Sequence, residues 1–289
     1  MKSVLISLIF LSVIAMNSDK PAYRIFDSKG EQSDYHELLK KVQNADIVFF
    51  GELHNNPICH WLELELTKDL YKLKKDNLIL GAEMFEADNQ LIINEYLNEE
   101  IKENTFEPEA KLWPNYKTDY KPLLVFAKKN KLKFICTNIP RRYASIVNSK
   151  GFEGLDNLGD QAKKYITPLP VKYDAELDCY KQMLKMGQMR HIDKDYDILN
   201  LPKAQAIKDA TMAYFILKHY LKGKLFLHYN GSYHSDNFEG IVWYIKQKKD
   251  LNILTITSVE QENTEVLNKI FLNKADYILC IPEDMTKTY

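Results

Sequence analysis

Six short apolar runs constrain the fold of this 289-residue chain more than any other feature. They are continuous rather than alternating, and glycine, asparagine or an acidic residue often follows the run. The runs cover residues 47–50, 78–81, 132–136, 225–229, 253–256 and 277–281. Continuous apolar runs of this length are typical of strands buried on both faces, as in a parallel sheet covered by helices.

Helical patterns separate the runs. Residues 57–74 carry leucine or isoleucine every three or four positions, with Asn56 as a capping residue and Pro57 at the first helical position. A second helix is expected at about residues 203–221, where alanines and leucines share one stripe. Alternating strands and helices predict an α/β fold in which a parallel sheet is flanked by helices.

Two long stretches interrupt this alternation. Residues 87–119 and 141–202 are charged and mostly helical in pattern, and prolines divide the second into short pieces. We expect both to be inserts that form a helical subdomain over one edge of the sheet. Residues 16–289 are then expected to form a single α/β domain that carries these inserts.

The first fifteen residues have the pattern of a signal peptide. Lys2 precedes an apolar block at residues 4–11, and Ala15 marks the expected cut. A buried N-terminal strand or helix is the alternative. No lipobox cysteine lies near the cut, since the first cysteine is Cys59, and no segment of the mature chain is apolar for the length of a transmembrane helix. We expect an exported protein of the periplasm or cell envelope.

Composition argues against nucleic acid as a partner, and the positions of the glycines indicate a candidate binding site. The chain has 39 Lys+Arg against 40 Asp+Glu, so it lacks the basic surface expected of a nucleic-acid binder. It has only 10 glycines, and two of them, Gly51 and Gly231, stand three residues before a histidine at the end of a predicted strand. In parallel sheets, ligands bind outside the carboxyl ends of the strands, so these positions are candidates for a site.

Four side chains are expected at this rim: His54, His234, Glu52 and Glu83. Histidine and carboxylate ligate divalent transition metals, and Glu52 or Glu83 would also serve as a general base. The alternative is that both histidines only cap strands and helices through hydrogen bonds. Gln205 and Asp209 share a helix face directed either to this rim or to solvent.

Several blocks of the chain, in order, resemble the ChaN-like haem-binding uptake family. They are residues 51–60 (GELHNNPICH), 83–86, 138–141, 205–213 and 231–234. That family belongs to a superfamily with the Tiki and TraB proteins and the erythromycin esterases. The resemblance implies an α/β sheet with a helical subdomain, and haem binding in the cell envelope for iron acquisition. It also implies a homodimer and an outer-membrane haem uptake system as partner, although the family's lipobox cysteine is missing here.

Haem needs an apolar slot and an axial ligand. The candidate cofactor-binding residues are Tyr180 and Tyr143, because the resemblance implies tyrosine ligation, together with Arg142 and His60. Arg142 and its neighbour Arg141 would grip a haem propionate or form a structural ion pair. Three methionines at helical spacing would line a slot or fill a core: Met183, Met186 and Met189.

Two functions of different class follow. The first is a haem- or iron-binding protein without turnover. The second is a metal-dependent hydrolase of the peptidase or esterase type, in which His54 and His234 bind the metal and Glu52 or Glu83 activates water. Arg141 would then stabilise the charge that develops on the substrate oxygen.

Overall fold

The computed structural model describes residues 20–189 and 198–289, so the predicted signal peptide lies outside the described residues. Within those two ranges, no helix has both the length and the apolar character needed to cross a bilayer.

One eight-stranded sheet runs through the molecule in the order β2-β1-β8-β7-β3-β6-β4-β5. Its six parallel strands are β3 (Ile47–Glu52), β4 (Leu78–Glu86), β5 (Lys133–Asn138), β6 (Leu225–Gly231), β7 (Ile253–Gln261) and β8 (Tyr277–Pro282). All six predicted runs are these strands, and the predicted α/β class is confirmed. Two short antiparallel strands, β1 (Arg24–Asp27) and β2 (Gln32–Ser33), extend one edge.

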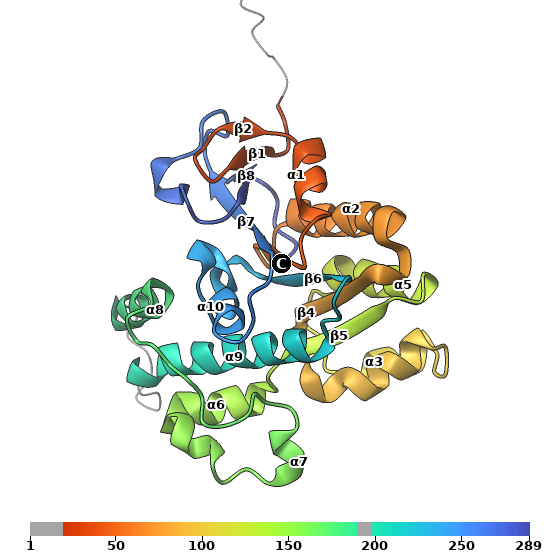
Figure 1. Cartoon of the computed structure of the whole chain (residues 1–289), viewed down its shortest axis with the longest axis vertical. Coiled ribbons are helices and arrows are strands. Elements are labelled where there is room, and N and C mark those ends of the chain that lie inside the picture. Colours follow the sequence, from red (N-terminus) through yellow and green to blue (C-terminus); the bar gives the residue numbers. More distant parts are fainter. Residues whose placement is uncertain (1–19, 190–197) are drawn as a thin grey trace, which may run out of the picture.

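Helices cover both faces of the sheet (Figure 1). Side chains such as Val48 and Phe50 pack against one group of helices: α1 (Tyr35–Val42), α2 (Pro57–Lys74), α3 (Gln90–Leu97) and α5 (Lys121–Lys129). Ile47 and Phe49, which point the other way, pack against α9 (Leu201–His219) and α10 (Ile241–Lys246). The strands are therefore apolar on both faces, as continuous runs require.

The two long inserts are helical as expected. The first holds α3, α4 (Glu103–Glu109) and a π-helical turn at Tyr116–Tyr120. The second holds α6 (Arg141–Lys150), α7 (Asp160–Lys163) and α8 (Asp178–Met189), and its helices α6 and α8 pack against α9 (Figure 1). Short 3₁₀ turns occupy Lys75–Asn77, Ala87–Asn89, Phe152–Leu155, Ile198–Asn200, Ser232–His234, Asp236–Phe238 and Lys269–Phe271.

Local sequence explains how α2 leaves the rim. The Asn56 side chain accepts a hydrogen bond of 3.0 Å from the Ile58 N–H, and Pro57 takes the first helical position without losing a hydrogen bond. The helix occupies the range predicted from its periodicity. It begins five residues after β3 and so holds its first turn against the end of that strand.

Pairing of β3 with β6 positions the two Gly-x-x-His segments side by side. The strands are parallel, with Glu52 opposite Gly231. Gly51 lies so close to the loop after β6 that a Cβ there would be 2.9 Å from the Ser232 Cα atom. Only glycine allows this approach, so both segments leave the sheet at one point of its rim.

Candidate functional site

A pocket of about 630 Å³ opens at the carboxyl ends of β3, β4 and β6. Helices α8 and α9 and the chain's last residue, Tyr289, contribute to its wall. The residues that line it are Glu52, Leu53, His54, Asn55, Glu83, Glu86, Trp113, Asn138, Ile139, Arg141, Met183, Gln205, Lys208, Gly231, Ser232, Tyr233, His234 and Tyr289.

His54 is the more exposed of the two histidines in the pocket wall, with 34% of its side chain accessible. Its Nδ1 lies 2.6 Å from Glu52 Oε1, and its ring packs edge-on against Trp113. Burial alone would lower the pKa of His54, but the hydrogen bond to Glu52 and the charge of Glu83 raise it above its ordinary value. A methyl group on Gly231 would lie 2.7 Å from His54 Nε2, so this nitrogen occupies space that only glycine leaves free.

His234 is buried between two carboxylates. Its Nε2 lies 3.1 Å from Glu83 Oε1, and its Nδ1 lies 2.5 Å from Asp209 Oδ1. Burial opposes the imidazolium, but the charges of Glu83 and Asp209 outweigh it and raise the pKa of His234 to about 9. His234 is therefore a cation at neutral pH with both ring nitrogens engaged.

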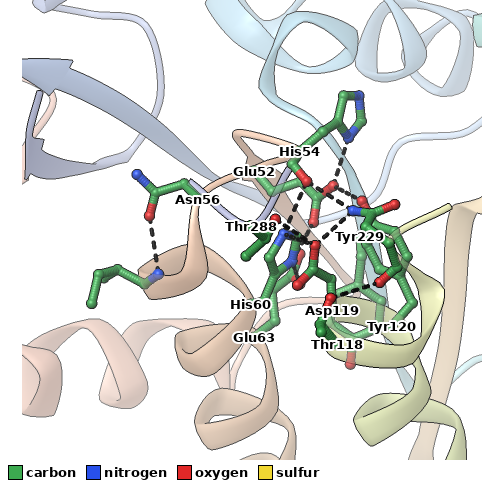
Figure 2. A network of polar contacts seen from close by, with 12 residues as sticks. Glu52, His54, Asn56, His60, Glu63, Thr118, Asp119, Tyr120, Tyr229 and Thr288 are labelled. Atoms are coloured by element: carbon green, nitrogen blue, oxygen red, sulfur yellow. Dashed lines mark hydrogen bonds and ion pairs between the residues drawn. The ribbon is translucent and has the colours of Figure 1, made fainter. Parts of the chain in front are cut away.

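A third histidine, His60, lies behind the pocket in a buried polar network (Figure 2). Its Nδ1 is 3.2 Å from Glu52 Oε2 and 3.3 Å from Glu63 Oε2, while its Nε2 is 3.1 Å from the His54 carbonyl oxygen. Burial disfavours its charge, but the hydrogen bonds to both glutamates raise the pKa of His60 to about 11. Burial would raise the pKa of Glu52, yet His54 and His60 lower it to about 2. Burial and the Glu52 charge raise the pKa of Glu63 well above its ordinary value.

Tyrosine hydroxyls support both histidine–carboxylate pairs of the pocket. Tyr120 donates a 2.8 Å hydrogen bond to Glu52 Oε1, and Tyr180 donates one of 2.8 Å to Asp209 Oδ2. Each carboxylate is thus fixed by a phenol while it holds an imidazole. Such support fixes the orientation of a ligand or base before anything binds.

Five of the predicted site residues line the pocket: Glu52, His54, Glu83, Arg141 and His234. The sheet brings them together at one rim, but it does so as carboxylate–imidazole pairs. In the two described ranges, three potential metal ligands do lie close together: Glu52, His60 and Glu63. One ligand atom from each residue lies within 4.8 Å of the others. This set shares only Glu52 with the predicted metal ligands His54, His234, Glu52 and Glu83.

The four predicted cofactor-binding residues lie outside the pocket wall. Tyr180 and His60 are buried in the networks described above, and burial raises the pKa of Tyr180 far above its ordinary value. Arg142 forms a 2.6 Å ion pair with Asp88 and donates to the Tyr143 hydroxyl, which is the structural alternative for this arginine. Their role toward a cofactor stays a prediction. Met183 does line the pocket, whereas the side chains of Met186 and Met189 lie outside the described part of the chain.

Sequence reasoning left Asp209 open and missed Glu63. Asp209 is 1% exposed and faces the rim, not solvent. Glu63 follows His60 by three residues on α2, so the two side chains share one helix face. That spacing was the available signal, because a glutamate placed one turn after a rim histidine is positioned to contact it.

Stability should fall as the pH rises, because the pKa of His234 is raised on folding. With an unfolded value near 6.5 and a folded value of about 9, its contribution is fully present below about pH 6.5 and is lost as the pH passes about 9. We expect this group alone to remove about 2 kcal/mol between about pH 7 and about pH 9.5. Urea unfolding followed by tryptophan fluorescence at several pH values measures the effect. His234→Gln should flatten this profile and His219→Gln should not; equal profiles for His234→Gln and the native chain would contradict the assignment.

Comparisons with known proteins place this chain in a family. The family model described as "Haem-binding uptake, Tiki superfamily, ChaN" matches residues 38–245. A solved structure described as cofacial haem binding to ChaN of Campylobacter jejuni has a TM-score of 0.66 at 19% identity, over 89% of this chain and 96% of that one. A succinoglycan biosynthesis protein has a TM-score of 0.50 at 12% identity, over 86% and 91%. Both likenesses concern the fold.

A curated relative matches part of the chain. RETICULATA-RELATED 5, a chloroplastic protein of Arabidopsis thaliana, is 29% identical over 157 residues, which are 50% of this chain and 21% of that protein. This chain therefore spans about a fifth of the length of the relative. The family model covers well over half of the chain, so the resemblance found in the motifs is confirmed: the chain belongs to the ChaN haem-binding uptake family of the Tiki superfamily.

Proposed function

We propose that this protein binds haem in the rim pocket and serves iron acquisition. The observation that carries the proposal is the composition of the pocket wall, which combines apolar surface, two cations and one accessible imidazole. Its volume of about 630 Å³ lies within the range of small-molecule and cofactor sites. Family membership supplies the identity of the ligand.

The wall offers the apolar surface that a porphyrin needs. Trp113 enters it from the first insert, Met183 from α8 of the second insert, Ile139 from the connection after β5, and Tyr233 from the turn after β6. Aromatic and thioether side chains make favourable contacts with a flat π-system. The inserts that interrupt the strand and helix alternation thus supply much of the proposed slot.

Two cations in the wall suit the haem propionates. Arg141 is exposed at the start of α6, and Lys208 lies on α9 one position before Asp209. Both line the pocket, and the charge of Lys208 also helps to lower the pKa of Glu83. A guanidinium also binds a carboxylate through two parallel hydrogen bonds.

We assign the axial contact to His54. Glu52 holds its Nδ1 at 2.6 Å and leaves Nε2 as the coordinating atom, and a carboxylate partner of this kind makes an imidazole a stronger ligand. Haem would supply the iron. The chain's own part is to orient the ring of His54 and to shield it with Trp113.

Export and dimerisation belong to the same proposal. The charged and apolar pattern of residues 1–15 supports export to the periplasm or cell envelope, where an outer-membrane uptake system would be the haem partner. Resemblance to the family supports a homodimer in which a tyrosine would complete the ligation.

Haemin titration tests the proposal. We expect a saturable shift of the Soret band for the native chain and an affinity at least about tenfold lower for His54→Ala. His36→Ala, which removes an exposed histidine on α1, is the matched control and should bind as the native chain does. Size-exclusion chromatography of the same samples reports the oligomeric state. Absence of a saturable shift would rule out haem binding.

One observation favours a second candidate, the metal-dependent hydrolase. A point at the missing side chain of Gly231 lies 2.7 Å from His54 Nε2 and 3.5 Å from Glu83 Oε2, so an oxygen atom placed there would contact an imidazole and a carboxylate. His54 and His234 would then bind the metal and Arg141 would stabilise the oxyanion. Stoichiometric metal that is lost in His54→Ala, together with no Soret shift, would favour this function over haem binding.

A further inference from the structure

We propose that the inner cluster, formed by Glu52, His60 and Glu63, binds a divalent first-row transition metal ion behind the rim pocket. The proposal does not depend on haem binding. It shares Glu52 with the rim pocket and adds His60 and Glu63, which do not line that pocket.

Geometry is the first argument. His60 Nδ1 lies 3.2 Å from Glu52 Oε2 and 3.3 Å from Glu63 Oε2, and one ligand atom from each residue falls within 4.8 Å of the others. Four-coordinate metals with nitrogen and oxygen ligands at 2.0–2.2 Å have ligand atoms about 3.4 Å apart. An ion therefore fits between these three groups with little movement.

Charge is the second argument. Glu52, Glu63 and the neighbouring Asp119 are all at least 97% buried, and among the described residues His60 is the cationic group in direct contact with all three. Carboxylates buried without compensating charge are costly. A divalent ion neutralises two carboxylates at once.

One buried carboxylate oxygen of the cluster lacks a partner. Among the described residues, Glu63 Oε1 is inaccessible to solvent and has no hydrogen-bond donor, and the buried Glu52 Oε2 has only the 3.2 Å contact with His60 Nδ1. Buried polar atoms are nearly always paired, so an unpaired oxygen in this cluster requires an explanation. A cation bound between the two carboxylates would provide the missing partner.

Surrounding contacts already orient the ligands. The His60 Nε2–H faces the His54 carbonyl oxygen at 3.1 Å, so a metal ion that displaces the Nδ1 proton would find the Nδ1 lone pair directed toward the two glutamates. His54 and Tyr120 contact the other oxygen of Glu52, Oε1, so that Oε2 faces His60 (Figure 2). Asp119 contacts His60 at Nε2, on the far side of the ring, and so belongs to the supporting groups rather than to the ligands.

The inner cluster adjoins the rim pocket. Glu52 belongs both to the inner cluster and to the residues that line the pocket, whereas His60 and Glu63 lie behind it. One imidazole and two carboxylates suit Zn²⁺, Mn²⁺ or Fe²⁺, and solvent would complete the coordination.

Metal titration of the full chain tests the site. The purified protein is stripped with a chelator and titrated with Zn²⁺ and, separately, with Mn²⁺; bound metal is measured by mass spectrometry of the elements. We expect one equivalent of bound metal ion per protein chain. Co²⁺ provides a second readout, because its visible absorption bands report the geometry of the ligands.

Variants locate the ion. Glu63→Gln keeps the shape of the side chain, removes its charge and should weaken binding at least about tenfold. Glu65→Gln, two residues further on α2, is the matched control and should bind as the native chain does. Circular dichroism confirms that each variant is folded, and haemin binding should be unchanged in Glu63→Gln, so failure here is separable from failure of the haem proposal.

Three results would overturn the assignment. The native chain would bind no stoichiometric metal, or Glu63→Gln would bind as tightly as the native chain, or His234→Asn would lose the metal while Glu63→Gln retained it. The last result would indicate that the metal ion binds at the rim histidines and not at the inner cluster.

Discussion

Replacing Gly231 with alanine is expected to lower the affinity for haemin by about 100-fold or more while the fold is retained. The backbone at this position (φ −54°, ψ 134°) is one that alanine adopts without strain. Its new methyl group, however, would lie 2.7 Å from His54 Nε2 and 2.8 Å from Cε1. The ring of His54 must then leave its place on Glu52, and the proposed axial nitrogen goes with it.

Gly159→Ala is the matched control for this substitution. No atom lies within 4 Å of a Cβ at Gly159, and its φ is negative, so the variant should bind haemin normally. Soret titrations of both variants measure the affinity, and thermal unfolding confirms the fold. Native-like binding by Gly231→Ala would show that His54 is not the axial residue.

Replacing Glu83 with glutamine is expected to lower the free energy of unfolding by about 3 kcal/mol at neutral pH. Glu83 is 4% exposed, lies 3.1 Å from His234 Nε2 and accepts a 2.8 Å hydrogen bond from the Gly231 N–H. The amide keeps the shape but not the charge. The imidazolium of His234 is then left with Asp209 alone, and its pKa should fall from about 9.

Glu86→Gln provides the comparison, since Glu86 ends the same strand in a more exposed position with a long 3.5 Å contact to Lys111. Glu86→Gln should lower the free energy of unfolding by no more than about 1 kcal/mol. Urea unfolding of both variants gives the difference, and the double variant Glu83→Gln/His234→Gln should recover part of the loss because no charge is then left unpaired. Equal losses for Glu83→Gln and Glu86→Gln would contradict the ion-pair account.

The parallel strands and the helix at Pro57–Lys74 were predictable because each is specified by local pattern. Buried strands need continuous apolar residues, and α2 needs a cap, a first-turn proline and a helical period. The antiparallel edge was not predictable in this way. β1 has four residues with charged ends and β2 has two, which is too short for a pattern.

The rim was predictable for a related reason, since strand ends and glycines are visible in the sequence. Which side chains pair with one another at the rim was not predictable. Asp209 contacts His234 because of how α9 turns as it packs on the sheet, and Arg142 pairs with Asp88 from the other insert. Contacts of this kind depend on packing between distant segments, which no local pattern encodes.

Register between β3 and β6 also sets when the site can exist. Glu52 pairs with Gly231, so the two halves of the pocket come from opposite ends of the chain. A nascent chain that ends before Leu225 already carries Glu52, His54 and Glu83 but has no strand to insert between β3 and β4. We therefore expect the Glu52–His54 pair and Glu83 to come together at one rim only after β6 has been synthesised and has inserted between β3 and β4.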